Sequence, residues 1–315
     1  MKRSLVLLLL VVSVPASAAR RRAALPPAAS APCTTVRGLA AMTVSRDGGH
    51  TFLGNEAPMP RNTYVRGVAA LDASTVLVAT IDALYQSDDG GCSYHAIASL
   101  SGIDLPPSIT AAGAARAYVW SRQTLLRWDR GSVTPLVPPG LSIAAAGAKG
   151  DEVRLVEAYG TMWESHDAGG TWSRRGAAEN VLTYDAAWDP NDLDHVVRST
   201  RGIEVSRDGG ATWTASASPS NVVYDLAFSS AGIWAASLDG ILHSADGGAS
   251  FSVAVATNVA HDNGILVADG ARIYWMVGDE LRTLDGLVAN ISGLERFDVL
   301  GGVIHAARSE HVIVN

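Results

Sequence analysis

Four aspartates recur about forty residues apart in the second half of the chain, and three of them follow a tyrosine or a histidine. Carboxylates at equivalent points of a repeating fold could bind a cation, an amine or the hydroxyl groups of a sugar. Like charges held close together also raise one another's pKa, which is typical of functional sites. An arginine occupies the equivalent position in an earlier repeat, and we call this set of equivalent positions the column. The candidate ligand-binding residues are Arg66, Tyr184, Asp185, Tyr224, Asp225, His261, Asp262 and Asp298.

A purely structural interpretation of the same column stays open. Each aspartate could accept a hydrogen bond from the backbone of the neighbouring repeat and hold the turn there. The column also contains the uncharged residues Thr110 and Ala144. If the repeats close into a ring, we expect Arg66 to lie beside Asp298.

These residues sit in a repeat of about forty residues that is marked by the pattern Ser-x-Asp-x-Gly-x-x-aromatic. Repeats start at positions 45, 87, 128, 165, 206, 244 and 283, and the copies at 128 and 283 are degenerate. A fixed period of this length is typical of solenoids and propellers. The five strong copies are Ser45, Asp47, Gly49 and Phe52; Ser87, Asp89, Gly91 and Tyr94; Ser165, Asp167, Gly169 and Trp172; Ser206, Asp208, Gly210 and Trp213; and Ser244, Asp246, Gly248 and Phe251.

Each repeat predicts four strands, which we call A to D. Two apolar runs joined by a tight turn precede the motif, as at Asp239-Gly240, and such a turn between apolar runs signals a hairpin. A further run precedes each hairpin, and the motif itself lies in the turn from C to D. Because one such sheet cannot bury both of its faces alone, the sequence predicts an all-β, seven-bladed β-propeller of four-stranded antiparallel blades.

The two ends of the chain are expected to complete one blade between them, which closes the ring. Strand C of that blade is offered twice, by Met42–Ser45 near the start and by His311–Asn315 at the end. One of these two segments is therefore a spare edge strand, or the propeller has an eighth, partial blade.

The motif resembles the Asp-box, or bacterial neuraminidase repeat, of sialidases, xyloglucanases, sortilin-type receptors and photosystem II assembly-factor-like propellers. The resemblance covers most of the chain. It implies a propeller whose motif turns lie away from the binding face, but no single activity, because these families differ in function on the same frame. We expect the five motif aspartates to stabilise their turns, in which glycine permits left-handed backbone and the aromatic residue packs between sheets.

The composition argues against a general nucleic-acid-binding protein and against a membrane-spanning protein. Its 315 residues are 48% apolar and 17% charged, with a formal net charge of −7, whereas phosphate binding needs a basic surface. Residues 1–18 combine two basic residues, an apolar run and Ala16-Ser17-Ala18, which predicts a signal peptide and export to a periplasm or the extracellular space. Residues 19–32 are expected to be a disordered leader, and residues 33–315 a single propeller.

Cys33 and Cys92 are the two cysteines of the chain. An oxidising compartment permits a disulfide between them, and two unpaired thiols are the alternative.

The favoured function is a non-catalytic binding or scaffold module for a protein, peptide or glycan. A glycoside hydrolase of the sialidase or xyloglucanase type is the alternative, since the aspartate column could supply two carboxylates. The Arg-Ile-Pro signature expected of sialidases before the first motif is not present in the sequence, and the connections between strands are short for a substrate groove. We expect a monomer with no cofactor, metal, nucleic acid or transmembrane segment.

Overall fold

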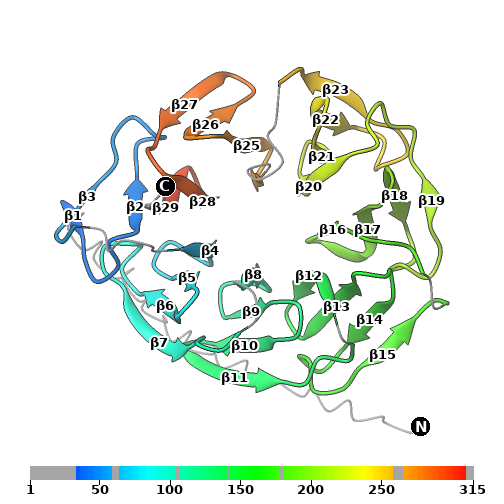
Figure 1. Cartoon of the computed structure of the whole chain (residues 1–315), viewed down its shortest axis with the longest axis horizontal. Helices are drawn as coiled ribbons and strands as arrows, with labels where there is room; N and C mark the ends of the chain where they lie inside the picture. Colours follow the sequence, from blue (N-terminus) through cyan, green and yellow to red (C-terminus); the bar gives the residue numbers. More distant parts are fainter. Residues whose placement is uncertain are drawn as a thin grey trace, which may run out of the picture. The chain divides into compact units, whose positions relative to one another are not determined.

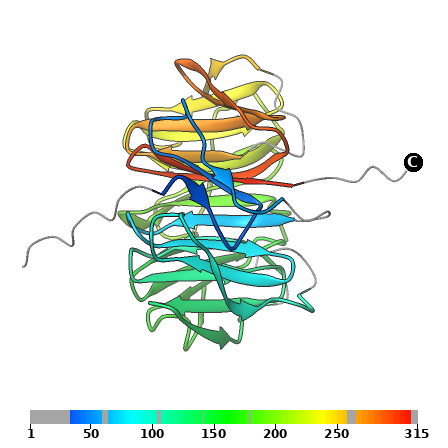
Figure 2. The ribbon, with the colours of Figure 1, turned by 90° about the vertical axis from the view of Figure 1, so that its left-hand side faces the viewer.

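The computed structural model describes residues 33–58, 64–103, 107–140, 142–177, 180–257 and 265–309. Every regular element in these ranges is a β-strand, and no helix there is long and apolar enough to cross a membrane. The strands form seven antiparallel sheets arranged around a central axis (Figure 1), and Figure 2 shows the same sheets from the side. The predicted all-β, seven-bladed propeller is confirmed.

Six blades are contiguous in sequence, and in each the strands run from the axis outward in chain order. Blade 1 contains β4 (Val65–Ala70), β5 (Val76–Thr80), β6 (Ala83–Ser87) and β7 (His95–Ser99); blade 2 contains β8 (Ser108–Ala111), β9 (Arg116–Trp120), β10 (Leu125–Asp129) and β11 (Ser132–Leu136); and blade 3 contains β12 (Ile143–Lys149), β13 (Glu152–Glu157), β14 (Met162–Ser165) and β15 (Ser173–Arg175). Blade 4 contains β16 (Asp185–Asp189), β17 (Asp192–Ser199), β18 (Ile203–Ser206) and β19 (Thr214–Ala215); blade 5 contains β20 (Val223–Ser229), β21 (Gly232–Ser237), β22 (Gly240–Ser244) and β23 (Ser252–Val255); and blade 6 contains β24 (Leu266–Asp269), β25 (Arg272–Val277), β26 (Glu280–Thr283) and β27 (Gly286–Asn290).

The seventh blade joins the two ends of the chain. Strands β28 (Leu294–Leu300) and β29 (Val303–Arg308) come from the C-terminal end, and β2 (Met42–Ser45) pairs with β29 from the N-terminal end. The blue β2 accordingly lies beside the red strands in Figure 1. Met42–Ser45 is thus strand C of the closing blade, while the competing segment His311–Asn315 lies outside the described residues.

The pattern of burial explains why the blades must stack. Second strands are buried on both faces, as in β5, where all five residues are buried, whereas outer strands such as β7 are largely exposed. Apolar side chains of adjacent blades interlock, and Trp128 of blade 2 packs with Leu77 and Leu84 of blade 1. The free energy of this burial is available only when each sheet has a neighbour on both sides.

The five motif turns share one hydrogen-bond pattern. In the first copy the Ser45 hydroxyl donates to Asp47 Oδ1 at 2.8 Å, and the Gly49 N–H donates to Ser45 Oγ at 2.8 Å. The Thr51 N–H and hydroxyl donate to the two Asp47 oxygens at 2.9 Å and 2.6 Å. The aspartate therefore bonds a backbone N–H four residues on, rather than two as expected from simple turns. Every oxygen of this carboxylate is used inside the turn.

One copy departs from the others at the position after the aspartate. Four copies have glycine there with φ of +68° to +72°, but Ala168 occupies it in blade 3 with φ +59°. Left-handed backbone is strained for a residue that carries a Cβ.

We expect Ala168→Gly to raise the free energy of unfolding by about 0.5 kcal/mol, because it removes this strain. Gly48→Ala is the matched control, since a Cβ at Gly48 would meet no atom within 4 Å and adds only the strain. Urea unfolding should show the two substitutions changing stability in opposite directions. Equal signs would contradict the strain argument.

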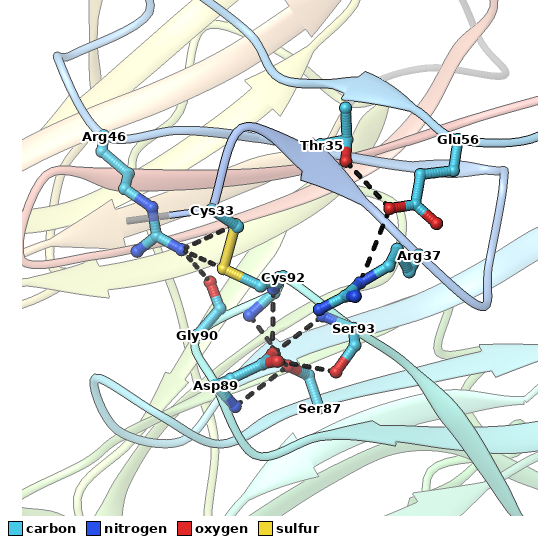
Figure 3. The surroundings of a disulfide bond; sticks show 11 residues. Cys33, Thr35, Arg37, Arg46, Glu56, Ser87, Asp89, Gly90, Cys92 and Ser93 are labelled. Carbon is cyan, nitrogen blue, oxygen red and sulfur yellow. Dashed lines mark hydrogen bonds and ion pairs between the residues drawn. A yellow bond between two sulfur atoms is a disulfide. The ribbon is translucent and has the colours of Figure 1, made fainter. Parts of the chain in front are cut away.

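The seam between blades 7 and 1 carries a clasp at its outer rim (Figure 3). The strand β1 (Thr35–Val36) pairs in parallel with β3 (Gly54–Asn55). Next to it, the Arg37 N–H donates to the Cys92 carbonyl at 2.9 Å, and the Tyr94 N–H donates to the Arg37 carbonyl at 3.0 Å. A disulfide joins Cys33 to Cys92, and Arg46 Nη2 donates to the Gly90 carbonyl at 2.9 Å.

The same pair of backbone hydrogen bonds occurs between blades 4 and 5, where the polypeptide is continuous. There the Ala217 N–H donates to the Ala249 carbonyl and the Phe251 N–H to the Ala217 carbonyl. Ala217 therefore corresponds to Arg37 at the seam. The N-terminal segment replaces the connection that a continuous chain would supply, and the disulfide makes this replacement covalent.

The double substitution Cys33→Ser/Cys92→Ser should lower the free energy of unfolding by about 4 kcal/mol, because the bridge closes a loop spanning 59 residues. Urea unfolding of the variant measures the loss, and reduction of the wild-type protein should reproduce it. An unchanged unfolding midpoint in both experiments would show that the clasp does not hold the ring closed.

Candidate functional site

The central channel is the candidate site that the predicted residues point to. The blades stand radially, so the innermost strand of each faces the axis (Figure 1), and the channel encloses about 800 Å³. Arg66, Tyr184, Asp185, Tyr224, Asp225 and Asp298, six of the eight predicted site residues, line it. His261 and Asp262 lie outside the described residues.

The aspartates do not stand at one level of the channel. We count the pairs of facing residues from the turn that follows each innermost strand. Asp225 and Ala236 form the fifth pair in blade 5, whereas Asp298 and His305 form the third pair in blade 7. The residue of β28 in the fifth pair is Arg296. Two residues of extended chain correspond to about 7 Å. The aligned column was therefore two residues out in blade 7, because matching an aromatic residue followed by an aspartate does not fix the register of a strand within its sheet.

Each described aspartate of the column bonds the backbone of the next blade. The carboxylate reaches across the gap between two innermost strands and accepts an N–H there, which is the structural interpretation of the column. The contacts are Leu226 N to Asp185 Oδ2 at 3.0 Å, Leu266 N to Asp225 Oδ2 at 2.7 Å and Ala70 N to Asp298 Oδ2 at 2.7 Å. Ligand binding by these carboxylates stays a prediction.

Asp185 and Asp225 form a close carboxyl pair. The Leu226 N–H donates to both of them, at 3.0 Å to Asp185 Oδ2 and 2.8 Å to Asp225 Oδ1. Burial and the negative charge of Asp225 raise the pKa of Asp185 well above its usual range, and burial raises the pKa of Asp225 to about 6. Two buried carboxyl groups so close together disfavour the state in which both are ionised.

Two arginines share the channel with these acids. Arg296 Nε donates to the Arg66 carbonyl at 3.2 Å, and burial together with the charge of Arg66 lowers the pKa of Arg296. Arg66 Nε is buried and has no hydrogen-bond partner among the described residues. Arg66 was expected to lie beside Asp298; blade 7 does adjoin blade 1, but Asp298 bonds Ala70, four residues further along β4. The arginines offset the negative charge that the sequence predicted for the channel.

Sequence reasoning missed Arg296 as a channel residue. Its signal was present, because it lies two residues before Asp298 and so shares the same face of the strand. Without the register of β28 in its blade, however, its level could not be matched to that of Asp225.

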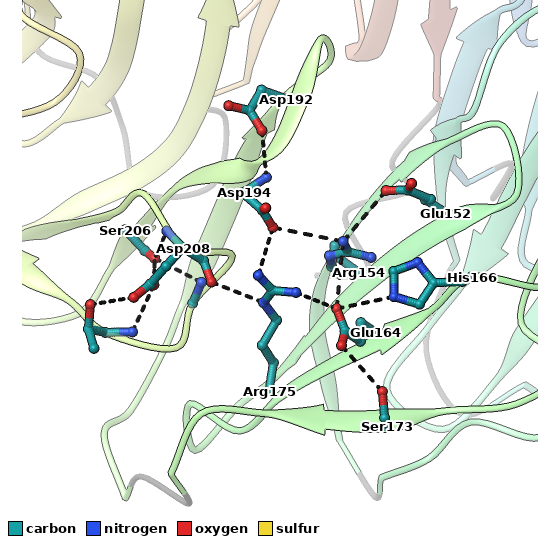
Figure 4. A network of polar contacts seen from close by, with 12 residues as sticks. Glu152, Arg154, Glu164, His166, Ser173, Arg175, Asp192, Asp194, Ser206 and Asp208 are labelled. Atoms are coloured by element: carbon teal, nitrogen blue, oxygen red, sulfur yellow. Dashed lines mark hydrogen bonds and ion pairs between the residues drawn. The ribbon is translucent and has the colours of Figure 1, made fainter.

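A second polar cluster joins blades 3 and 4 (Figure 4). Arg175 lies 2.6 Å from Glu164 and 2.9 Å from Asp194, and the buried Arg154 lies within 4.0 Å of both acids. The Arg175 Nε donates to the Asp208 carbonyl at 3.0 Å. These groups pair across the interface between blades 3 and 4, although Arg154 Nε is buried without a hydrogen-bond partner among the described residues.

No group of three histidine, cysteine, aspartate or glutamate side chains in the described part of the chain is placed to hold a metal ion.

The fold and the channel define a seven-bladed β-propeller with a polar, open axis. No protein-family model matches the sequence. A curated protein described as the dispase autolysis-inducing protein of Streptomyces mobaraensis is 34% identical over 150 residues, which is 46% of this chain and 40% of that protein. The match thus spans less than half of the relative's length.

Solved propellers resemble the structure more broadly but at low identity. A structure described as YCF48 bound to D1 peptide has a TM-score of 0.60 at 11% identity and covers 88% of this chain and 100% of its own. The GH74 enzyme of Niastella koreensis has a TM-score of 0.54 at 18% identity and covers 82% of this chain and 39% of its own. At these identities the likeness shows the fold alone.

The channel carboxyls should make stability fall as pH rises. Burial raises the pKa of Asp298 to about 7, so its contribution is complete below the unfolded-state pKa of about 3.9 and is lost as pH rises through 7. Relative to wild type, Asp298→Asn should therefore gain on the order of 3 kcal/mol between pH 4 and pH 8. Urea unfolding across this range measures the difference, with exposed Asp239→Asn as the control. Parallel curves for wild type and Asp298→Asn would contradict it.

Proposed function

We propose that this chain is an exported, non-catalytic propeller of the Asp-box type that binds a protein, peptide or glycan at the mouth of its channel. Residues 1–18 would direct the export as a signal peptide. The observation that carries the proposal is that the channel carboxyl groups accept hydrogen bonds from backbone N–H groups. The channel around them is open and is lined by Tyr184 and Tyr224.

The comparisons supply precedent for a protein or peptide ligand. The curated relative is named for inducing autolysis of dispase, which is an effect on another protein. One propeller of the same fold was solved with a bound peptide. Both are statements about those proteins, and they favour a protein or peptide over a glycan for this chain.

Glycoside hydrolysis is less compatible with the geometry. Retaining enzymes hold two carboxyls about 5–5.5 Å apart and inverting enzymes about 6.5–9.5 Å apart, with oxygens free to reach the sugar. In Asp225 both oxygens accept backbone N–H groups, and Asp185 shares one of those donors.

Two measurements on the mature protein test the proposal together. Immobilised protein should retain a partner from the culture medium of its native host, and the purified partner should bind it in solution. A fluorogenic sialoside and xyloglucan should not be turned over. Hydrolysis that disappears in Asp185→Asn/Asp225→Asn, while the fold is retained, would overturn the non-catalytic assignment.

A further inference from the structure

The two cysteines of the clasp have unequal surroundings (Figure 3). Cys92 is 7% exposed, whereas Cys33 is half-buried. Access is one of the factors that decide which sulfur of a disulfide an incoming thiolate attacks. We therefore expect a thiolate from solution to attack the Cys33 sulfur, which makes Cys92 the leaving group.

Arg46 lies beside both sulfur atoms and closer to that of Cys92. Its Nη2 is 3.2 Å from Cys92 Sγ and 3.8 Å from Cys33 Sγ. The same nitrogen donates to the Gly90 carbonyl at 2.9 Å, which holds the guanidinium in place. A positive charge beside a sulfur stabilises its thiolate, and a more stable thiolate leaves faster in thiol–disulfide exchange. The arginine thus favours the departure of Cys92.

The placement of Arg46 follows a contact that recurs elsewhere on the rim. In blade 4, Arg207 Nη2 donates to the Gly247 carbonyl of blade 5 at 2.9 Å. Ala249 stands there at the motif position that Cys92 occupies in blade 1. The arginine contact therefore exists without a disulfide, and only at the seam does it face sulfur. Arg207 provides a matched control for any role of Arg46 in exchange.

Asp89 is a charge that opposes a thiolate at Cys92. Its Oδ1 accepts the Cys92 N–H at 3.0 Å and the Ser93 N–H at 2.8 Å, and its Oδ2 accepts the Ser93 hydroxyl at 2.6 Å. Hydrogen bonds to both oxygens stabilise this carboxylate within its own turn. Arg46, by contrast, contacts the sulfur itself.

We propose that the Cys33–Cys92 bridge is a thiol–disulfide exchange site at which a low-molecular-weight thiol opens the clasp. The thiolate attacks Cys33 Sγ and forms a mixed disulfide, and the bond to Cys92 breaks with its electron pair on the Cys92 sulfur. A second thiolate attacks the small-molecule sulfur of the mixed disulfide and releases Cys33. In sum, two thiols become one disulfide, and the bridge gains their two electrons and two protons. The inference does not depend on what the channel binds.

Cleavage leaves only weak contacts to hold the N-terminal segment on blade 1. Besides the parallel pair β1–β3, these are the Arg37 N–H to the Cys92 carbonyl and the Tyr94 N–H to the Arg37 carbonyl. Between blades 4 and 5 the chain continues through the equivalent Ala217, so the same hydrogen bonds stay tethered there. The segment can therefore open locally while β2 remains paired with β29.

Treatment of the full mature protein with 2-mercaptoethanol tests the order of attack. The reaction is stopped in acid, free thiols are blocked with N-ethylmaleimide, and peptides are identified by mass spectrometry. We expect the mixed disulfide on Cys33 and the blocked thiol on Cys92, in about tenfold excess over the reverse. Equal amounts of both products, or an excess on Cys92, would overturn the proposal. Reduction that occurs only in urea would overturn it as well.

Rate measurements with variants test the role of Arg46. The rate constant of the first step should fall about fivefold in Arg46→Gln, recover in Arg46→Lys and stay unchanged in Arg207→Gln. In Cys33→Ser, absorbance at 240 nm reports the thiolate fraction of Cys92 at pH 8, which added Arg46→Gln should lower at least twofold. This second readout separates stabilisation of the leaving group from attraction of the attacking thiolate. Unchanged values in both measurements would show that Arg46 takes no part.

Amide hydrogen exchange of the reduced and blocked wild-type protein tests the opening itself. The Arg37 and Tyr94 amides should exchange about tenfold faster than in the oxidised protein. The Ala217 and Phe251 amides, which form the equivalent contacts between blades 4 and 5, should keep their rates. Unchanged protection at Arg37 would show that cleavage does not open the clasp. Equal acceleration at all four amides would indicate loosening of the whole ring and would contradict a local opening.

Discussion

Each sheet of this protein has two apolar faces and can cover neither of them by itself. Trp128, Leu77 and Leu84 become a core only because blade 2 stands against blade 1, and the same dependence recurs around the ring. A stack with open ends would leave two such faces in water. Closure is therefore the condition on which the whole fold depends, and the chain must bring its two ends together to meet it.

The seam shows how that condition is met. The strand β2 completes the blade begun by β28 and β29, and the N-terminal segment around Arg37 occupies the position that Ala217 occupies where the chain is continuous. The disulfide then converts this contact into a covalent link. The joint between these distant segments is thus reinforced at the outer rim.

The channel follows from the same closure. Seven innermost strands meet around an axis, and the carboxylates of Asp185, Asp225 and Asp298 each bond a backbone N–H of the next blade, which joins three of these strands to their neighbours. These acids are consequently engaged, and Arg296 and Arg66 offset their charge.

Sequence alone determined the architecture, because a repeated turn motif and short apolar runs are local signals that recur in every unit. It placed Ser45 and Asp47 in a turn and assigned both ends of the chain to one blade. It could not decide which end supplies strand C, because that depends on pairing between segments far apart in sequence, or the level at which Asp298 stands, because residue types alone do not fix strand register. The place of Arg296 in the channel was equally hidden, because it is decided only when β28 pairs in its blade and that blade faces the axis.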